Sequence, residues 1–506
     1  MANQDSALLA YLAAGAEMAQ RPWPRYRLSR DQWQDLILHL AVADWTLLAL
    51  WGEPTIVYAT FYDSAAAAIG VASLDCPDGH FPSLSGVRPS AIRLERAAQD
   101  LYGLTADGLT DVRPWLDHGQ WRHAQSPPAG APAAQRAAND YHFLPVEGEG
   151  IHQIPVGPVH AGIIEPGGFR FHCNGEAVVR LEQRLGYTHK GTESLMVGKL
   201  PEEAAQFAAR LSGDSTVACS LAFAQAAEWA TGTTVPPRAV YLRALMGELE
   251  RVANHFGDIG AICNDAAFAF MLAHFSVLRE EVLRIAESCF DHRLMMDRVV
   301  PGGVTQDLNP IGEARLRAFM PDARDRLSAL LAVYDNKPSL LDRTFGTGIV
   351  SAALARQFGA GGYVGRASGR DIDARRDPGY PPYDELVLSV PVLPGGDVNS
   401  RLMVRAREVE ASLSLIEQIL DRLPGGSLRV PIGRRAGEGI GLVEGFRGDY
   451  LAWVSLTETG AVRRAHLRDP SWFQWPLLEA AIENNIVADF PLCNKSFNCS
   501  YSGHDL

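Results

Sequence analysis

The second half of the chain carries apolar residues at the three- and four-residue spacing typical of amphipathic helices. The pattern extends over 201–232, which predicts one long helix or two, and over 237–261, which has Pro237 at its start. The same spacing recurs in three further segments, 271–289, 313–334 and 402–422. Long helices with few strands predict an α-helical bundle with a small β edge.

The first part of the chain mixes helical and strand patterns. Residues 30–53 are helical in pattern and then apolar, and 55–63 are β-branched and aromatic, as in a strand. An amphipathic helix is expected over 90–104, where Gly103 closes it. Short strands separated by Gly and Pro turns are expected over 151–187. These patterns together predict an α+β chain.

A change in composition suggests where the domains divide. Residues 124–140 are rich in Ala, Pro and Gly and show no periodicity, which is typical of a linker. We therefore predict a small N-terminal α/β domain over 1–123, a linker over 124–150, and a mainly α-helical domain with a small β edge over 151–506.

Charge and cysteine content restrict the class of protein. The 506 residues include 59 acidic and 46 basic ones, so nucleic acid is not an expected partner. We find no uncharged apolar run of about 18 residues and no basic region typical of a signal peptide in residues 1–20. The seven cysteines form no C-x-x-C pair, so we expect free, buried thiols in a cytoplasmic protein.

Several short polar motifs stand out, although each is weak by itself. The string "RLGYTHKGTESLM" at 184–196, for example, is more often a solvated turn than a proton relay. The motifs lie at 81–104, 108–116, 154–176, 184–196, 210–220, 362–377, 394–408 and 489–506. Their specificity comes from their order and spacing along the chain.

In this order the motifs resemble the large subunit of membrane-bound, complex-I-related [NiFe] hydrogenases, of the formate hydrogenlyase and hydrogenase-4 type. In that family a domain similar to the 30-kDa subunit of respiratory complex I precedes a hydrogenase-like part. The second part is also similar to the 49-kDa subunit of NADH-quinone oxidoreductase. Residues 81–116 match the first part and 154–506 the second. The resemblance implies a subunit of an oxidoreductase.

The resemblance also locates the positions at which hydrogen-producing members hold nickel and iron with four cysteines. The early pair falls on Ser212 and Ser215, and the late pair on Ser500 and Gly503. Nickel in such a site needs soft thiolate donors, whereas a serine hydroxyl stays neutral and glycine has no side chain. We therefore expect that this chain supplies no metal ligands, binds no cofactor through its own ligands and is not an active hydrogenase.

Two cysteines lie near these positions without matching them. Cys219 follows Ser215 by one helical turn, about 6 Å along the axis, and Cys499 directly precedes Ser500. Two thiols at the wrong offsets do not rebuild a cage of four thiolates, so both are interpreted as buried structural residues. Nickel-containing members usually carry a C-terminal extension that is removed after metal insertion, and a nickel-free chain is expected to need none.

The quinone-binding branch of the family offers a second set of residues. There, a quinone-liganding His falls near Ile164 or Glu165 rather than on His160, and a liganding Tyr falls near Gly213. Neither ligand is in place, although a differently lined cavity for a quinone stays open as an alternative. His160 and Glu165 are the candidates to line it.

Asp214 allows two interpretations. Between two serines at the start of a predicted helix, it is a good N-cap. Alternatively, Asp214 forms a polar network with His189, Glu193 and Arg366 in the former metal cavity and relays protons. These four residues are our candidate catalytic set. The charged residues around Arg366 equally suit structural ion pairs.

The hypothesis is a nickel-free large subunit on the cytoplasmic face of the membrane, which closes an electron-transfer cavity in a complex-I-like assembly. The resemblance implies a [4Fe–4S] small subunit, similar to the cluster-carrying small subunit of complex I, docked near 157–170 and 187–193. It also implies a ferredoxin-like subunit and membrane subunits similar to ion pumps. Two alternatives stay open: a quinone-binding oxidoreductase subunit, and an assembly scaffold that transfers no electrons.

Overall fold

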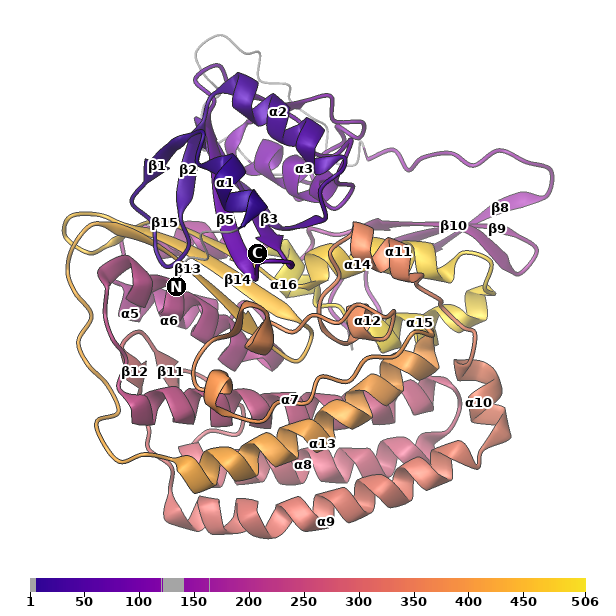
Figure 1. The fold of residues 1–506 in the computed structure, drawn as a ribbon. Helices are drawn as coiled ribbons and strands as arrows, with labels where there is room; N and C mark the ends of the chain where they lie inside the picture. The colour runs from indigo at the N-terminus through magenta and orange to yellow at the C-terminus, as the bar shows by residue number, and fades with distance from the viewer. Residues whose placement is uncertain (1–5, 120, 122–140, 163) are drawn as a thin grey trace.

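The computed structural model describes residues 6–119, 121, 141–162 and 164–506. The N-terminal domain is built on a five-stranded sheet in the order β1-β2-β5-β4-β3, in which β2 and β5 are parallel and the other neighbours antiparallel (Figure 1). The strand expected over 55–63 is confirmed as β4. The five strands are β1 (Ala16–Met18), β2 (Arg25–Leu28), β3 (Trp45–Glu53), β4 (Ile56–Asp63) and β5 (Ala68–Asp75).

The sheet is buried on both faces, which explains why β3 to β5 are almost continuously apolar. Helices cover one face, and the predicted helix over 90–104 is confirmed as α3, which ends at Gly103 with a positive φ of 70°. The helices are α1 (Ala7–Leu12), α2 (Arg30–Leu40) and α3 (Ala91–Tyr102), with a small parallel pair formed by β6 (His80–Pro82) and β7 (Thr105–Asp107).

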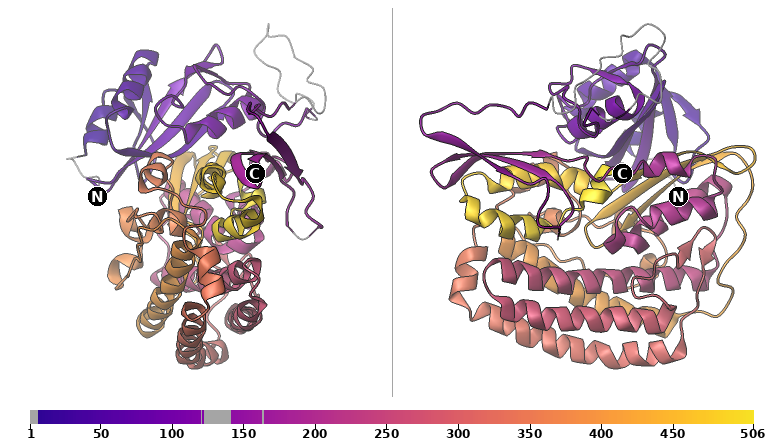
Figure 2. Two further views of the ribbon diagram at one scale, coloured as in Figure 1. Left: turned by 90° about the vertical axis from the view of Figure 1, so that its right-hand side faces the viewer. Right: turned by 180° about the vertical axis from the view of Figure 1, so that it is seen from behind.

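Between the N-terminal domain and the rest lies the predicted linker, of which residues 124–140 fall outside the described residues. Residues 141–150 form no helix or strand. The strands expected over 151–187 follow as an antiparallel sheet that extends to one side of the molecule (Figures 1 and 2). They are β8 (Ile151–Val156), β9 (Gly168–Asn174) and β10 (Ala177–Arg184).

Long helices form the opposite end of the molecule from the N-terminal domain (Figure 2). The region 201–232 is two helices, because the chain breaks at the short turn Gly213–Ser215 between them. The main helices are α5 (Pro201–Ala208), α6 (Thr216–Thr231), α7 (Pro237–Asp265), α8 (Ala269–Phe290), α9 (Pro310–Asp335) and α13 (Val398–Arg422). Shorter ones are α4 (Thr192–Met196), α10 (Pro338–Thr344), α11 (Ala352–Gln357) and α12 (Gly362–Arg366). The predicted helical bundle is confirmed.

A further sheet, which the expectation of a largely helical region missed, lies between the bundle and the N-terminal domain. Its antiparallel strands are β13 (Gly437–Glu444), β14 (Asp449–Leu456) and β15 (Val462–Arg468). Trp453 of β14 packs on Trp51 of the N-terminal sheet, with ring centroids 5.5 Å apart. On the other face α6 approaches β13 so closely that a Cβ at Gly439 would collide with the carbonyl oxygen of Ala226. Burial on both faces removes the alternation by which such strands are recognised.

The C-terminal segment returns to the middle of the molecule (Figure 1). There, the indole nitrogen of Trp115 lies 3.1 Å from His504 Nε2, which ties the N-terminal domain to the end of the chain. All seven cysteines are free and buried, as predicted. None of the helices within the described residues is both long enough and apolar enough to cross a membrane. The C-terminal helices are α14 (Ser471–Ile482), α15 (Phe490–Phe497) and α16 (Tyr501–Asp505).

Candidate functional site

The four positions matched above to nickel ligands by resemblance, Ser212, Ser215, Ser500 and Gly503, come together in the fold. Ser500 Oγ donates a hydrogen bond to Ser212 Oγ at 2.9 Å, although 288 residues separate them. The backbone N–H of Gly503 donates to Ser500 Oγ at 2.9 Å, and Ser215 stands directly before α6. The loop between α5 and α6 therefore meets the start of α16 at a single point.

A buried arginine lies against this point. Arg447, between β13 and β14, binds the Asp214 carboxylate with both terminal nitrogens, at 2.8 and 2.5 Å, and donates to Ser215 Oγ at 2.9 Å. Tyr450 donates to the same Ser215 hydroxyl at 2.7 Å. Burial alone would raise the pKa of Asp214, but the Arg447 guanidinium outweighs it and holds the pKa at about 2. About a third of the Asp214 side chain stays exposed.

A second carboxylate, Asp469, lies beside the serines, Gly503, Asp214 and Arg447, and these residues together are called the cluster below. Asp469 is fully buried, and its Oδ2 atom has no hydrogen-bond partner. Burial raises the pKa of Asp469, and the negative charge of Asp214 adds to this, whereas Arg447 opposes it. A Cβ at Gly503 would collide with this carboxylate and lie 2.9 Å from Ser500 Oγ. A cysteine at position 503 therefore does not fit beside the Asp469 carboxylate.

The start of α6 is capped by a residue that the sequence analysis missed. Glu250 of α7 accepts hydrogen bonds from the backbone N–H groups of Val217 and Ala218, at 2.7 and 3.1 Å. The expectation that Asp214 caps this helix is therefore wrong, because its carboxylate turns to Arg447 instead. Burial raises the pKa of Glu250 to about 8. The sequence did contain one sign of this role, because Glu250 lies among the apolar positions of the helical pattern over 237–261.

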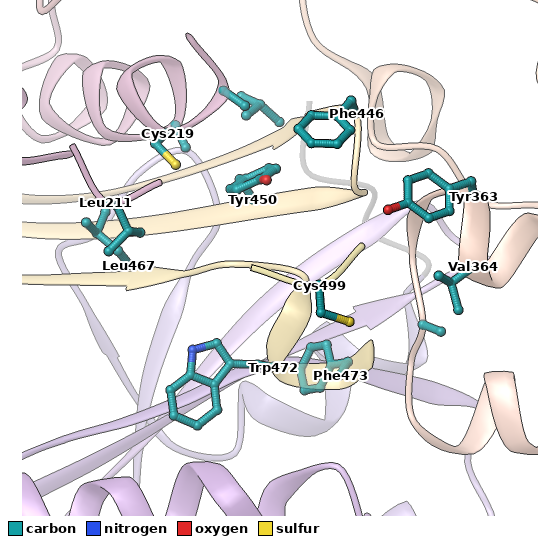
Figure 3. Close-up of a cluster of buried hydrophobic side chains, with 14 of the residues drawn as sticks. Leu211, Cys219, Tyr363, Val364, Phe446, Tyr450, Leu467, Trp472, Phe473 and Cys499 are labelled. Carbon is teal, nitrogen blue, oxygen red and sulfur yellow. The ribbon is translucent and has the colours of Figure 1, made fainter. Parts of the chain in front are cut away.

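This donor set does not fit a nickel–iron centre. Hydroxyls, a glycine and a guanidinium stand where soft thiolates would be needed. Burial raises the pKa of the Cys219 and Cys499 thiols above the usual range, so both stay protonated and are poor ligands. Figure 3 shows both thiols among buried side chains, with Cys219 on α6 and Cys499 near Phe473. Over the residues the structure describes, no three His, Cys, Asp or Glu side chains form a group suited to a metal ion.

Two of the other candidate residues lie away from Asp214. Glu193 is buried and binds Arg464, His466 Nδ1 and a backbone N–H, at 2.7, 2.9 and 2.9 Å. Burial opposes ionisation of Glu193, but Arg464 prevails and holds its pKa at about 2. His189 Nδ1 lies 2.7 Å from the carbonyl oxygen of Asp505, and the His189 ring packs near Trp121.

Arg366 belongs to a third group of charges, which is fully buried between α7, α12 and α13. Its guanidinium binds Glu408 at 2.7 Å and Glu444 at 2.8 Å, and Glu408 also lies 2.7 Å from His255 Nε2. Burial raises the pKa of Glu444 to about 7. Across the described parts of the chain, no hydrogen bond or ion pair directly joins any two of the four candidate catalytic residues, which therefore occupy separate groups.

The two candidate lining residues differ in position. His160 Nε2 lies 2.8 Å from the carbonyl oxygen of Gly167 within its own loop. Glu165 reaches the C-terminal segment, where it accepts a hydrogen bond from the backbone N–H of Ser502 at 3.1 Å. Glu165 thus touches the segment that carries Ser500, whereas Gly213, the position near which a quinone-binding Tyr was expected, offers no side chain.

The fold and this site define a class of large subunits with a small α+β domain ahead of a helical bundle. Models of the respiratory-chain NADH dehydrogenase 30 Kd and 49 Kd subunits match residues 28–131 and 265–436. Formate hydrogenlyase subunit 5 of Escherichia coli (strain K12) is 31% identical over 85% of this chain and 78% of its own length. The carbon monoxide-induced hydrogenase of Rhodospirillum rubrum is 31% identical over 69% of this chain and 97% of its own.

A solved structure agrees with these relatives. A chain of the membrane-bound sulfane sulfur reductase, an archaeal respiratory membrane complex, is 25% identical with a TM-score of 0.67, over 72% of this chain and all of that one. The protein therefore belongs to the family of large subunits of complex-I-related membrane-bound hydrogenases and NADH-quinone oxidoreductases. This confirms the resemblance inferred from the motifs and the order of its two parts.

Proposed function

We propose that this chain is the nickel-free large subunit of a membrane-associated redox complex. In this proposal it closes an electron-transfer cavity beside a [4Fe–4S] small subunit and couples electron transfer to the membrane arm. One observation carries the proposal. The four positions that align with nickel ligands still converge, but Ser212 and Ser500 bond to each other there and Arg447 pairs with Asp214.

The charges of the cluster support a role in proton transfer rather than metal binding. Asp214 and Asp469 share the neighbourhood of Arg447, so one guanidinium faces two carboxylates. The negative charge of Asp214 also raises the pKa of Glu250, which Arg251 opposes. Glu250, with a pKa of about 8, holds a proton near neutral pH and releases it readily. A protonated carboxyl group of this kind can donate its proton to a group that has gained an electron, and it can then be reprotonated from solvent.

The proposed partners follow from the relatives and from the surface. Large apolar side chains are exposed on the stretches where the small subunit is proposed to dock: Val159 is 70% exposed, Ile164 39% and Tyr187 40%. The archaeal relative belongs to a respiratory membrane complex. In this proposal the chain lies at the cytoplasmic face of the membrane, with a ferredoxin-like subunit and ion-pump-like membrane subunits as further partners.

The first experiment is a metal analysis of the intact complex. The chain is tagged and purified with its partners, and nickel and iron are measured by elemental mass spectrometry. Formate hydrogenlyase purified in the same way is the control and is expected to contain nickel. We expect nickel near zero and iron retained from the partner clusters. About one nickel per large subunit would contradict the proposal.

A second experiment separates a redox subunit from a scaffold. The purified complex is reduced with ferredoxin, and the reoxidation of its iron–sulfur clusters is followed with and without added quinones. Loss of turnover in Glu250→Gln and Asp214→Asn complexes that still assemble would support proton coupling at the cluster. The same two complexes with unchanged turnover would contradict it, and an assembled complex that transfers no electrons would favour the scaffold.

A further inference from the structure

A cavity separate from the cluster of Ser212 and Ser500 lies along α6 and reaches its C-terminal end. It is formed where residues 21–23 of the N-terminal domain, the end of α6 and residues 378–383 meet. Its volume is about 640 Å³, within the range of about 300–1,000 Å³ that is typical of small-molecule sites. Side chains of α6 line the cavity from Leu221 onward, whereas the cluster lies just before the first residue of this helix, Thr216.

Aromatic rings supply the apolar part of the lining. Trp23, Trp229 and Tyr380 come from the three different parts of the chain that form the cavity. Trp229 is 45% exposed, although α6 is otherwise largely buried. Tryptophan and tyrosine in such a position offer a flat apolar surface on which a ring can stack.

Two unpaired arginines stand at the edge of this cavity. Arg21 lines the cavity, and Arg435 lies beside it at Gly232, where an added Cβ would meet the guanidinium nitrogens of both. Within the described residues, neither guanidinium makes a hydrogen bond or ion pair. Two like charges so close together repel each other, although a chain with 59 acidic residues offers many possible partners.

The other charges in the wall are already satisfied. Arg243 binds both carboxylate oxygens of Glu228, at 3.1 and 2.5 Å, and also donates to backbone carbonyls. Glu228 accepts a further hydrogen bond from the backbone N–H of Gly302. This pair is therefore neutral, and the cavity keeps the positive charge of its two free arginines.

We infer that this cavity binds a small amphipathic anion. Its aromatic or apolar body would lie against Trp23, Trp229 and Tyr380, and its anionic group would bind Arg21 and Arg435. A planar carboxylate, sulfonate or phosphate group suits guanidinium donors, which bind such groups through paired hydrogen bonds. Because the ligand would touch both the N-terminal domain and the bundle, binding would hold the two together. The inference is independent of the proposed redox function.

The test uses the full-length chain and two fluorescent probes of the same shape. The probe 8-anilinonaphthalene-1-sulfonate carries one negative charge, and N-phenyl-1-naphthylamine is its neutral counterpart. We expect one tight site per chain for the anion. Arg21→Gln combined with Arg435→Gln should weaken the anion at least tenfold and change the neutral probe less than twofold. Arg434→Gln is the matched control, since Arg434 pairs with Glu202 instead, and it should change neither.

A further variant tests the aromatic wall. Trp229→Ala should weaken both probes several-fold, because stacking does not depend on the charge of the ligand. Circular dichroism and melting curves establish that each variant is folded. We expect them to be folded, because the substituted side chains are exposed. Equal affinity for the anion in the double arginine variant and the wild type would overturn the inference. A parallel loss of both probes in that variant would do so as well.

Discussion

Ser212 Oγ and Ser500 Oγ lie 2.9 Å apart in the core, joined by a hydrogen bond across 288 residues of sequence. Positions that the family resemblance matches to nickel ligands therefore meet in space, and they carry hydroxyls at 212 and 500. Arg447 and Asp214 form an ion pair beside them, which would compete for the space and the charge of a metal centre. Substitutions at these residues therefore test how the cluster is packed and paired.

Gly503→Ala tests how tightly the cluster is packed. The new Cβ would collide with the buried Asp469 carboxylate and press on Ser500 Oγ. Overpacking of this kind costs about 1–3 kcal/mol of unfolding free energy. Denaturant unfolding of the purified chain measures the loss. Gly213→Ala is the control, because a Cβ added there would meet no atom within 4 Å, and it should cost less than about 0.5 kcal/mol. Equal losses would contradict the packing argument.

Arg447→Met tests the ion pair itself. The substitution leaves Asp214 and the Ser215 hydroxyl without their cation, and it leaves the carbonyl of Asn498 without a donor. Breaking a fully buried pair costs about 3–5 kcal/mol, and the partial exposure of Asp214 reduces this to about 2–3 kcal/mol. Thermal or denaturant unfolding measures it.

A second substitution shows whether the unpaired Asp214 carboxylate causes the loss of stability in Arg447→Met. Arg447→Met combined with Asp214→Asn removes both charges, so it should be more stable than Arg447→Met alone. If the double variant loses as much stability as the sum of the two single ones, the two residues are not coupled.

Neighbouring arginines on β15 allow a matched comparison. Arg464 and its partner Glu193 are both less than 9% exposed, whereas Arg463, which pairs with Glu53, is 43% exposed. Arg464→Gln should therefore cost about 3–5 kcal/mol, and Arg463→Gln less than about 1 kcal/mol. Unfolding curves of the two variants, recorded under identical conditions, measure both losses of unfolding free energy. Similar costs would mean that burial does not control these pairs.

The sequence was sufficient for the features that depend on local pattern. Periodicity predicted α7 and α13, and the order of motifs predicted the family. Burial removed the signal for β13 to β15, whose strands pack between α6 and the N-terminal sheet and so do not alternate.

The contacts within the site were harder to predict from the sequence, because the residues that form them come from distant parts of the chain. Arg447 lies 233 residues from Asp214, and no local spacing connects them. Glu250 caps a helix that begins 34 residues before it, which hid its role. The serines and the glycine were found only because the resemblance to the family marks their positions.

The pH dependence of stability gives a test of Glu250. Its pKa is raised by burial from 4.5 to about 8 in the folded chain. Between these two values the folded state keeps a proton that the unfolded state has released, so this group stabilises the fold below about pH 4.5, and its contribution is lost as the pH rises to about 8. Glu250→Gln removes this dependence, although it also loses one of the two capping hydrogen bonds at every pH.

The difference in unfolding free energy between wild type and Glu250→Gln should therefore fall by up to about 1.4 kcal/mol per pH unit across this window. Above about pH 8 it should level off. Denaturant unfolding at a series of pH values measures the two curves. Glu203→Gln on the exposed side of α5 is the control, and its curve should run parallel to that of the wild type. Parallel curves for Glu250→Gln would show that Glu250 ionises alike in the folded and unfolded chain, and the proposed proton site would be lost.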